Sequence, residues 1–147
     1  MLVAGVVLAV GTAAPAFAQG DVIAERRAGF RMLGQTMEAF TQAVNQRGDT
    51  RALAPRVDQM TAFINSLPNR VPAASLTPPQ PQGTNEGQTR ALAAIDADRA
   101  TFATRASAAA AAFATLKTAA EAGTVTADTL RTVGGTCGAC HQPFRAR

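Results

Sequence analysis

The chain has 147 residues, the length of one ordinary domain, with a net charge of +4 carried by scattered arginines. It has no tryptophan or tyrosine and no run of basic residues, so nothing in it favours binding to nucleic acid. Alanine-rich composition with few strand-forming residues favours helices and argues against a sheet.

Residues 1–18 have the features of a secretory signal peptide. Residues 2–11, LVAGVVLAVG, form an uncharged apolar run, and Ala16, Phe17 and Ala18 make a small-residue cleavage signature. A membrane anchor is the alternative, but the run is too short to span a bilayer. We therefore predict export to the periplasm and a mature domain over residues 19–147, with no membrane attachment after cleavage.

Two amphipathic helices are predicted in the first part of this domain. The first extends from about Asp21 to Asn45, and the second begins near Asp49 or Thr50 and ends near Leu67. Their apolar residues recur at spacings of three and four, as on a core-facing helix. These residues are Ile23, Phe30, Leu33, Met37, Phe40 and Val44 in the first helix, and Leu53, Val57, Met60, Ile64 and Leu67 in the second.

A long proline-rich connection, residues 67–87, precedes two further predicted helices. The third extends from about Glu86 to Ala122, and the fourth begins near Thr126 and continues past both cysteines. Short first and last connections with one long middle loop indicate an all-α, antiparallel four-helix bundle. A helical array or a partner-dependent coiled coil is the alternative. The absence of internal repeats and the wide apolar stripes favour the bundle.

The chain places both cysteines and its only histidine within the string CGACH near the C-terminus. Cys137, Cys140 and His141 stand at i, i+3 and i+4, so a helix brings them onto one face. C-x-x-C-H is the attachment signature of a c-type haem, in which the cysteines form thioethers and the imidazole ligates iron. We predict one covalent haem c per chain, held by these three residues.

Three other interpretations explain the string less well. Structural zinc needs about four ligands, a thioredoxin-like site would follow a strand, and a disulfide between residues three apart closes almost no loop. Because His141 is the only histidine, a bis-histidine haem is impossible within one chain. The sixth position is then left to methionine, lysine, water, an external gas or nothing. The internal candidates are Lys117, Met32, Met37 and Met60.

Three stretches of the chain together resemble the class II cytochromes c, and more closely the high-spin cytochromes c′ of bacterial periplasms. They are VIAERRAGFRMLGQTM (22–37), TRALAAIDADRATF (89–102), and the C-terminal CGACH followed four residues later by Arg145. The resemblance covers essentially the whole mature chain. One departure is Asp96, where relatives often have an aromatic residue.

The resemblance implies roles for three further residues. Arg26 would approach a haem propionate, with Arg27 as the alternative, and Phe30 would lie over the distal face of the haem. Arg145 would be the basic residue near the proximal imidazole. Relatives with low-spin haem carry a ligating methionine at the position of Phe30, which a phenyl ring cannot replace.

This substitution predicts a five-coordinate, high-spin haem with His141 as its sole axial protein ligand. An apolar distal side disfavours charged ligands and leaves small neutral gases, NO and CO. The family further implies that NO can break the proximal bond, and that homodimers form through the first two helices. The alternatives are a one-electron carrier between periplasmic redox partners and a haem-free interaction module. No acid–base pair or nucleophile indicates an enzyme.

Overall fold

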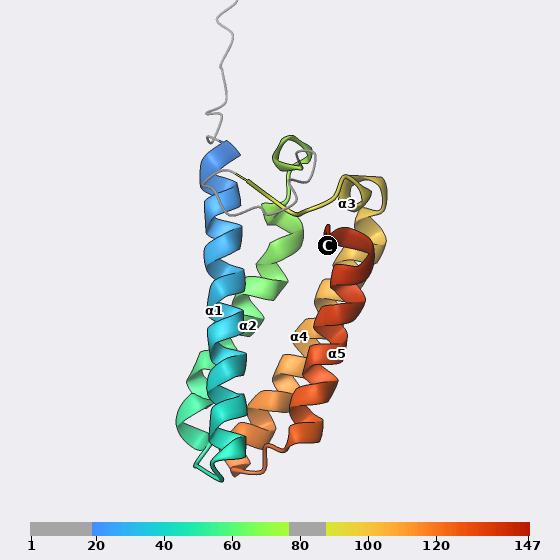
Figure 1. Cartoon of the computed structure of the whole chain (residues 1–147). Coiled ribbons are helices and arrows are strands. Elements are labelled where there is room, and N and C mark those ends of the chain that lie inside the picture. Colours follow the sequence, from blue (N-terminus) through green and yellow to red (C-terminus); the bar gives the residue numbers. More distant parts are fainter. Residues whose placement is uncertain (1–18, 77–87) are drawn as a thin grey trace, which may run out of the picture.

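The computed structural model describes residues 19–76 and 88–147, so the predicted signal peptide and much of the proline-rich connection lie outside the described residues. The described chain forms an antiparallel bundle of four long helices, as predicted (Figure 1). These helices are α1 (Gln19–Asn45), α2 (Ala54–Ser66), α4 (Arg99–Ala122) and α5 (Ala127–Phe144). A single turn, α3 (Ala94–Ala97), precedes α4, and short 3₁₀ turns occur at Arg51–Leu53, Leu67–Arg70 and Ala73–Ser75.

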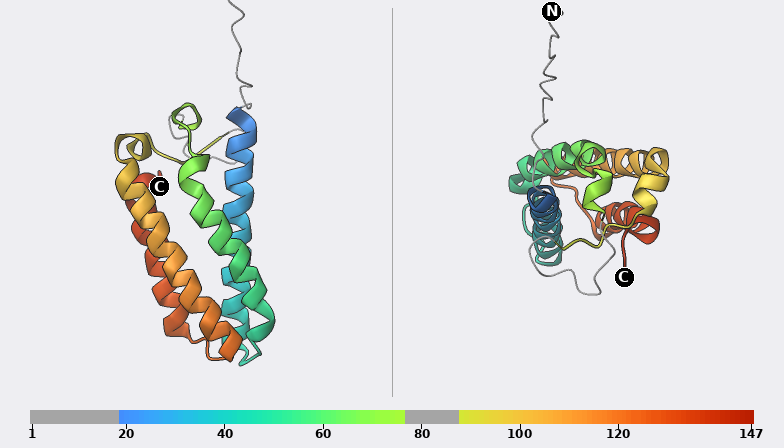
Figure 2. Two further views of the ribbon diagram at one scale, coloured as in Figure 1. Left: turned by 180° about the vertical axis from the view of Figure 1, so that it is seen from behind. Right: turned by 90° about the horizontal axis from the view of Figure 1, so that it is seen from above.

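Helices α1 and α2 spread away from α4 and α5 toward one end of the molecule (Figures 1 and 2). We call this the open end; α1 begins there and α5 ends there. The opposite, closed end carries the short α1–α2 and α4–α5 connections. Helix α2 packs mainly against α4, and α4 packs against α5, so α4 is central to the bundle.

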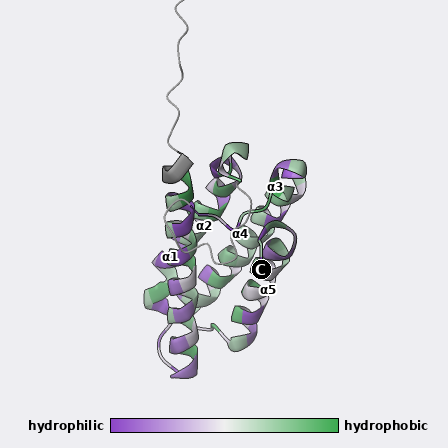
Figure 3. Ribbon diagram, turned by 45° about the horizontal axis from the view of Figure 1, so that its top comes forward, coloured by the Kyte–Doolittle hydropathy of each residue, from purple (hydrophilic) through white to green (hydrophobic). Residues whose placement is uncertain are grey.

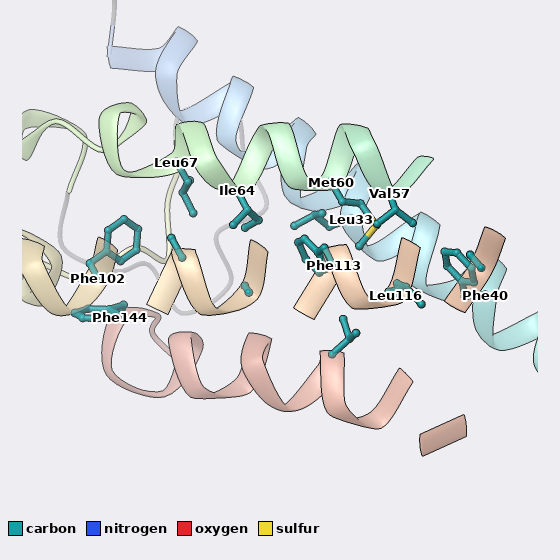
Figure 4. Close-up of a cluster of buried hydrophobic side chains, with 14 of the residues drawn as sticks. Leu33, Phe40, Val57, Met60, Ile64, Leu67, Phe102, Phe113, Leu116 and Phe144 are labelled. Atoms are coloured by element: carbon teal, nitrogen blue, oxygen red, sulfur yellow. The ribbon is translucent and has the colours of Figure 1, made fainter. Parts of the chain in front are cut away.

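The core fills the closed end and the middle of the bundle. Hydrophobic and hydrophilic residues alternate along the helices (Figure 3), and buried apolar residues of all four long helices form one cluster. Figure 4 shows side chains of α1, α2 and α4 meeting between the helices. The largest side chains with no exposed surface are Phe40, Val57, Met60, Phe113 and Leu116. At the open end the helices spread, and side chains leave a cavity there. No helix of the described residues is long and apolar enough to cross a membrane.

The predicted third helix was wrong at its start: α4 begins at Arg99 and not near Glu86. Residues 88–93 lie outside any helix, and Asp98 has φ −141° and ψ 68°. The Asp98 carboxylate accepts a hydrogen bond from the Thr101 backbone N–H, 3.0 Å away, and so caps α4. The apolar pattern continues across the break because Ile95, on α3, is also buried.

The α4–α5 turn fixes where α5 points. Helix α4 ends at Gly123, whose φ of 70° is the left-handed conformation that glycine adopts most readily. Helix α5 then starts with a capping box, in which the side chains of Thr126 and Thr129 each accept a hydrogen bond from the backbone N–H of the other. These caps direct α5 back along α4 toward the open end.

Candidate functional site

A cavity of about 690 Å³ lies at the open end, with walls from all four long helices. This volume is within the usual range for small-molecule and cofactor sites, about 300–1,000 Å³. Its walls are mostly apolar, with Ile23, Leu33, Ile64, Leu67, Val71, Ile95, Phe102 and Phe144 among them. The six residues that were assigned a role in haem binding also line the cavity, namely Arg26, Phe30, Cys137, Cys140, His141 and Arg145.

Helix α5 contributes the two cysteines and the histidine from one face, as the i, i+3, i+4 spacing predicts. The helix is continuous through them, and both cysteines are half-buried free thiols. Burial raises the pKa of the Cys137 and Cys140 thiols. Redox-active C-x-x-C sites have a lowered thiol pKa, so this environment is unlike theirs. Among the described residues, no group of three or more His, Cys, Asp or Glu side chains is placed to hold a metal ion by itself.

His141 and Phe30 both line the cavity, and their rings are in edge-to-face contact. Their ring centroids are 6.1 Å apart, with 64° between the ring planes. Burial, and next the charge of Arg145, lower the pKa of His141 and favour the neutral imidazole, the form that can ligate a metal. Phe30 is 39% exposed, although the sequence pattern placed it in the core, because its ring faces the cavity.

Arg26 is only 4% exposed, and its guanidinium joins the first part of the proline-rich connection to the segment that follows the connection. One nitrogen donates to the Arg70 carbonyl (3.2 Å) and the Ser75 hydroxyl (2.5 Å). The other donates to the Ser75 carbonyl and the Thr89 hydroxyl, both at 3.2 Å. These bonds use four of the five guanidinium N–H groups. The propionate role of Arg26 stays a prediction, with one N–H for which the described residues show no acceptor.

The charges around the cavity suit an anionic ligand. All hydrogen-bond partners shown for Arg26 are neutral oxygens, and burial lowers its pKa. A buried cation is costly without a counter-charge. The lining holds six arginines and, among the described residues, no Asp or Glu: they are Arg26, Arg27, Arg31, Arg90, Arg105 and Arg145. An apolar ring system bearing carboxylates, such as haem, fits this combination.

The four candidates for a sixth iron ligand differ in whether their side chains reach the cavity. Met37 lines the cavity, whereas Met32 packs against the core and Met60 is fully buried within it. Lys117 is not in the lining, because its ammonium group donates to both carboxylate oxygens of Asp58, at 2.7 and 2.9 Å. Only Met37 of these side chains is therefore near the site.

Several residues that complete the site were missed in the sequence. Ser75 and Thr89, which accept from Arg26, lie in irregular segments without a periodic pattern. Asp96, which had no explanation, holds Arg99 at 2.7 Å, and Arg99 in turn donates to the Val71 carbonyl of the cavity wall. A carboxylate three residues before an arginine was the only available signal.

The end of α5 is joined to the segment that follows the connection. The Leu92 N–H donates to the Phe144 carbonyl (3.0 Å), and the Ala146 N–H donates to the Arg90 carbonyl (2.8 Å). Ala91 and Arg145 form an isolated antiparallel bridge between these bonds. The cavity is thus bordered at the open end by a short backbone pairing as well as by helices.

The chain is similar to proteins of one known family. A family model described as Cytochrome C' matches residues 21–145. A triple mutant of Rhodopseudomonas palustris cytochrome c′ is similar in structure, with 28% identity, a TM-score of 0.64, and coverage of 86% of this chain and 98% of that chain. Cytochrome c′ from Rubrivivax gelatinosus has 22% identity and a TM-score of 0.62, covering 87% and 97%, which shows the fold alone. No curated protein matches the chain.

Proposed function

The chain belongs to the cytochrome c′ family, whose members carry haem c, and we propose that it is a periplasmic monohaem protein that binds small neutral gases, NO and CO, at a five-coordinate, high-spin iron. Cys137 and Cys140 would form the two thioethers by adding their thiols across the haem vinyl groups. His141 would be the sole axial protein ligand. The bound haem supplies the iron, with one position open to a gas.

The observation that carries this proposal is the contact of Phe30 with His141 in the cavity lining, at a centroid separation of 6.1 Å. The phenyl ring has no lone pair to offer a metal and no donor to offer a polar or charged ligand. The Phe30 side chain reduces the space for a ligand beside the histidine, but it cannot ligate the iron itself. Neutral diatomic molecules suit such a face better than anions do.

The arginines around the cavity would have two tasks. Arg145 would add to the effect of burial in keeping the His141 imidazole neutral, because a nearby positive charge disfavours protonation. The remaining arginines of the lining would offset the two haem carboxylates. A haem bound in this way would compensate the buried charge of Arg26 even if its remaining N–H is the only direct contact.

An optical spectrum of the reduced protein, recorded with and without CO, tests the proposal. We expect a high-spin, five-coordinate spectrum that shifts on addition of CO, and haem colour that remains with the polypeptide after extraction with acidified acetone. A low-spin spectrum in the ligand-free reduced protein would refute the open coordination position. Complete loss of colour on extraction would refute covalent attachment.

A one-electron carrier is the second candidate, and one observation favours it: Met37 lines the same cavity as His141. If a thioether from Met37 ligated the iron, the reduced protein would be low-spin, and Met37→Leu would make it high-spin. If the gas-binding proposal is right, Met37→Leu leaves the spectrum of the reduced protein unchanged.

A further inference from the structure

Phe63 of α2 lies directly on the backbone of α1 at Gly29. A Cβ atom on Gly29 would stand 2.0 Å from one ring carbon of Phe63 and 2.4 Å from two others. No side chain larger than that of glycine fits there without moving the ring. Phe63 is half-buried and packs against the core, but it does not line the cavity.

Phe63 also contacts the ring of Phe30. The two centroids are 5.2 Å apart with 86° between the planes, an edge-to-face pair in the favourable range for aromatic side chains. Phe30 is otherwise the most exposed large apolar residue described, so few other contacts restrict its ring. The ring of His141 also contacts Phe30, with the two centroids 6.1 Å apart.

We propose that Phe63, seated on Gly29, is a positioning residue that holds the Phe30 ring toward His141 and thereby sets the largest neutral ligand the cavity accepts. This inference rests on the gas-binding function proposed above and extends it to ligand size. Phe63 acts only through Phe30, because it does not reach the cavity itself. Without the Phe63 ring, Phe30 can turn toward α2 and leave more room opposite the histidine.

The test compares two neutral ligands of different size, CO and ethyl isocyanide, by their association rates with the reduced holoprotein. In Phe63→Leu we expect the isocyanide-to-CO rate ratio to rise about tenfold, the lower end of the change that one methylene group makes in an apolar pocket. Phe63→Tyr keeps the ring and is expected to keep the wild-type ratio. Leu53→Ala, which removes a half-buried core side chain remote from the cavity, controls for a general loss of packing.

Gly29→Ala provides a second variant, because its added methyl group must move the Phe63 ring while residue 63 itself remains phenylalanine. We expect a change in the same ratio, with the ligand-free spectrum still five-coordinate. An unchanged ratio in both Phe63→Leu and Gly29→Ala, or an equal change in Leu53→Ala, would overturn the role of Phe63. Reduced wild-type protein that binds neither ligand would instead overturn the proposed function.

Discussion

Replacing Arg26 with methionine tests whether one buried guanidinium holds the first part of the proline-rich connection, and the segment that follows it, on α1. Methionine retains much of the apolar stem, so packing along the cavity wall changes little. The substitution removes the charge and all four hydrogen bonds, two of them to Ser75, one to Arg70 and one to Thr89. The expected result is a less stable open end and a lower free energy of unfolding.

The magnitude follows from what happens to the acceptors. The hydroxyls of Ser75 and Thr89 each keep a second hydrogen bond, and Arg70 is exposed, so water can replace its lost partner. The Ser75 carbonyl belongs to a fully buried residue, and an orphaned buried acceptor costs about 1–3 kcal/mol. Hydrogen bonds to a charged donor contribute about 1.5–3 kcal/mol each, but desolvating the guanidinium offsets most of the sum. We expect a net loss of about 2–4 kcal/mol.

Urea unfolding of the holoprotein, followed by circular dichroism, measures this loss. With a slope of about 2 kcal/mol per molar urea, typical of a small domain, the midpoint should fall by about 1–2 M. Arg56→Met, an exposed arginine on α2, is the matched control and should change stability by less than about 0.5 kcal/mol. Arg26→Lys keeps the charge but cannot reach four acceptors, so most of the loss should remain. A loss below about 1 kcal/mol in Arg26→Met would refute the reasoning.

Three further predictions concern the distal face and the helix starts. Phe30→Met should make the reduced, CO-free spectrum low-spin, because a thioether then faces the histidine; a spectrum that stays high-spin would contradict the placement of Phe30. Thr126→Ala should lower the unfolding free energy by about 1 kcal/mol, since it breaks the capping box with Thr129, and a thermal melt at the wild-type temperature would argue against that cap. Hydrogen bonds from Thr101 lower the pKa of Asp98, so its stabilising effect is complete above its ordinary pKa of 3.8 and is lost as pH falls through the lower folded value. Asp98→Asn should therefore flatten the pH dependence of unfolding in this acid range, and an unchanged acid-unfolding profile would show that the cap is unimportant.

The helices and the cysteine–histidine face were predictable because both depend on short sequence spacing. The string CGACH needs only a helix to bring its three functional side chains together, and Leu130 and Val133 before it continue the same apolar pattern. The break at Asp98 was not predictable in this way. Ile95 and Phe102 stand seven residues apart, as in one helix, and both are buried despite the break between them.

The contacts that shape the cavity depend on residues far apart in the chain. Arg26 meets Ser75 and Thr89 across 49 and 63 positions, and these partners lie in segments without periodicity. Phe63 lies outside the apolar stripe of α2, next to Ile64, so the pattern assigned it no contact at all. Its contacts with Gly29 and Phe30 arise from the packing of α2 beside α1.

The backbone pairing of the C-terminal tail with residues 90–92 makes the walls of the cavity mechanically dependent on one another. Helix α5, with His141, is bonded through Phe144 to Leu92. The same segment is bonded through Thr89 to Arg26 on α1, which also carries Phe30. A closed loop of bonds therefore spans the open end, and a ligand that pushes α1 and α5 apart must stretch it. The width of the cavity therefore depends on α1 and α5 together, because these bonds transmit a displacement of either helix to the other.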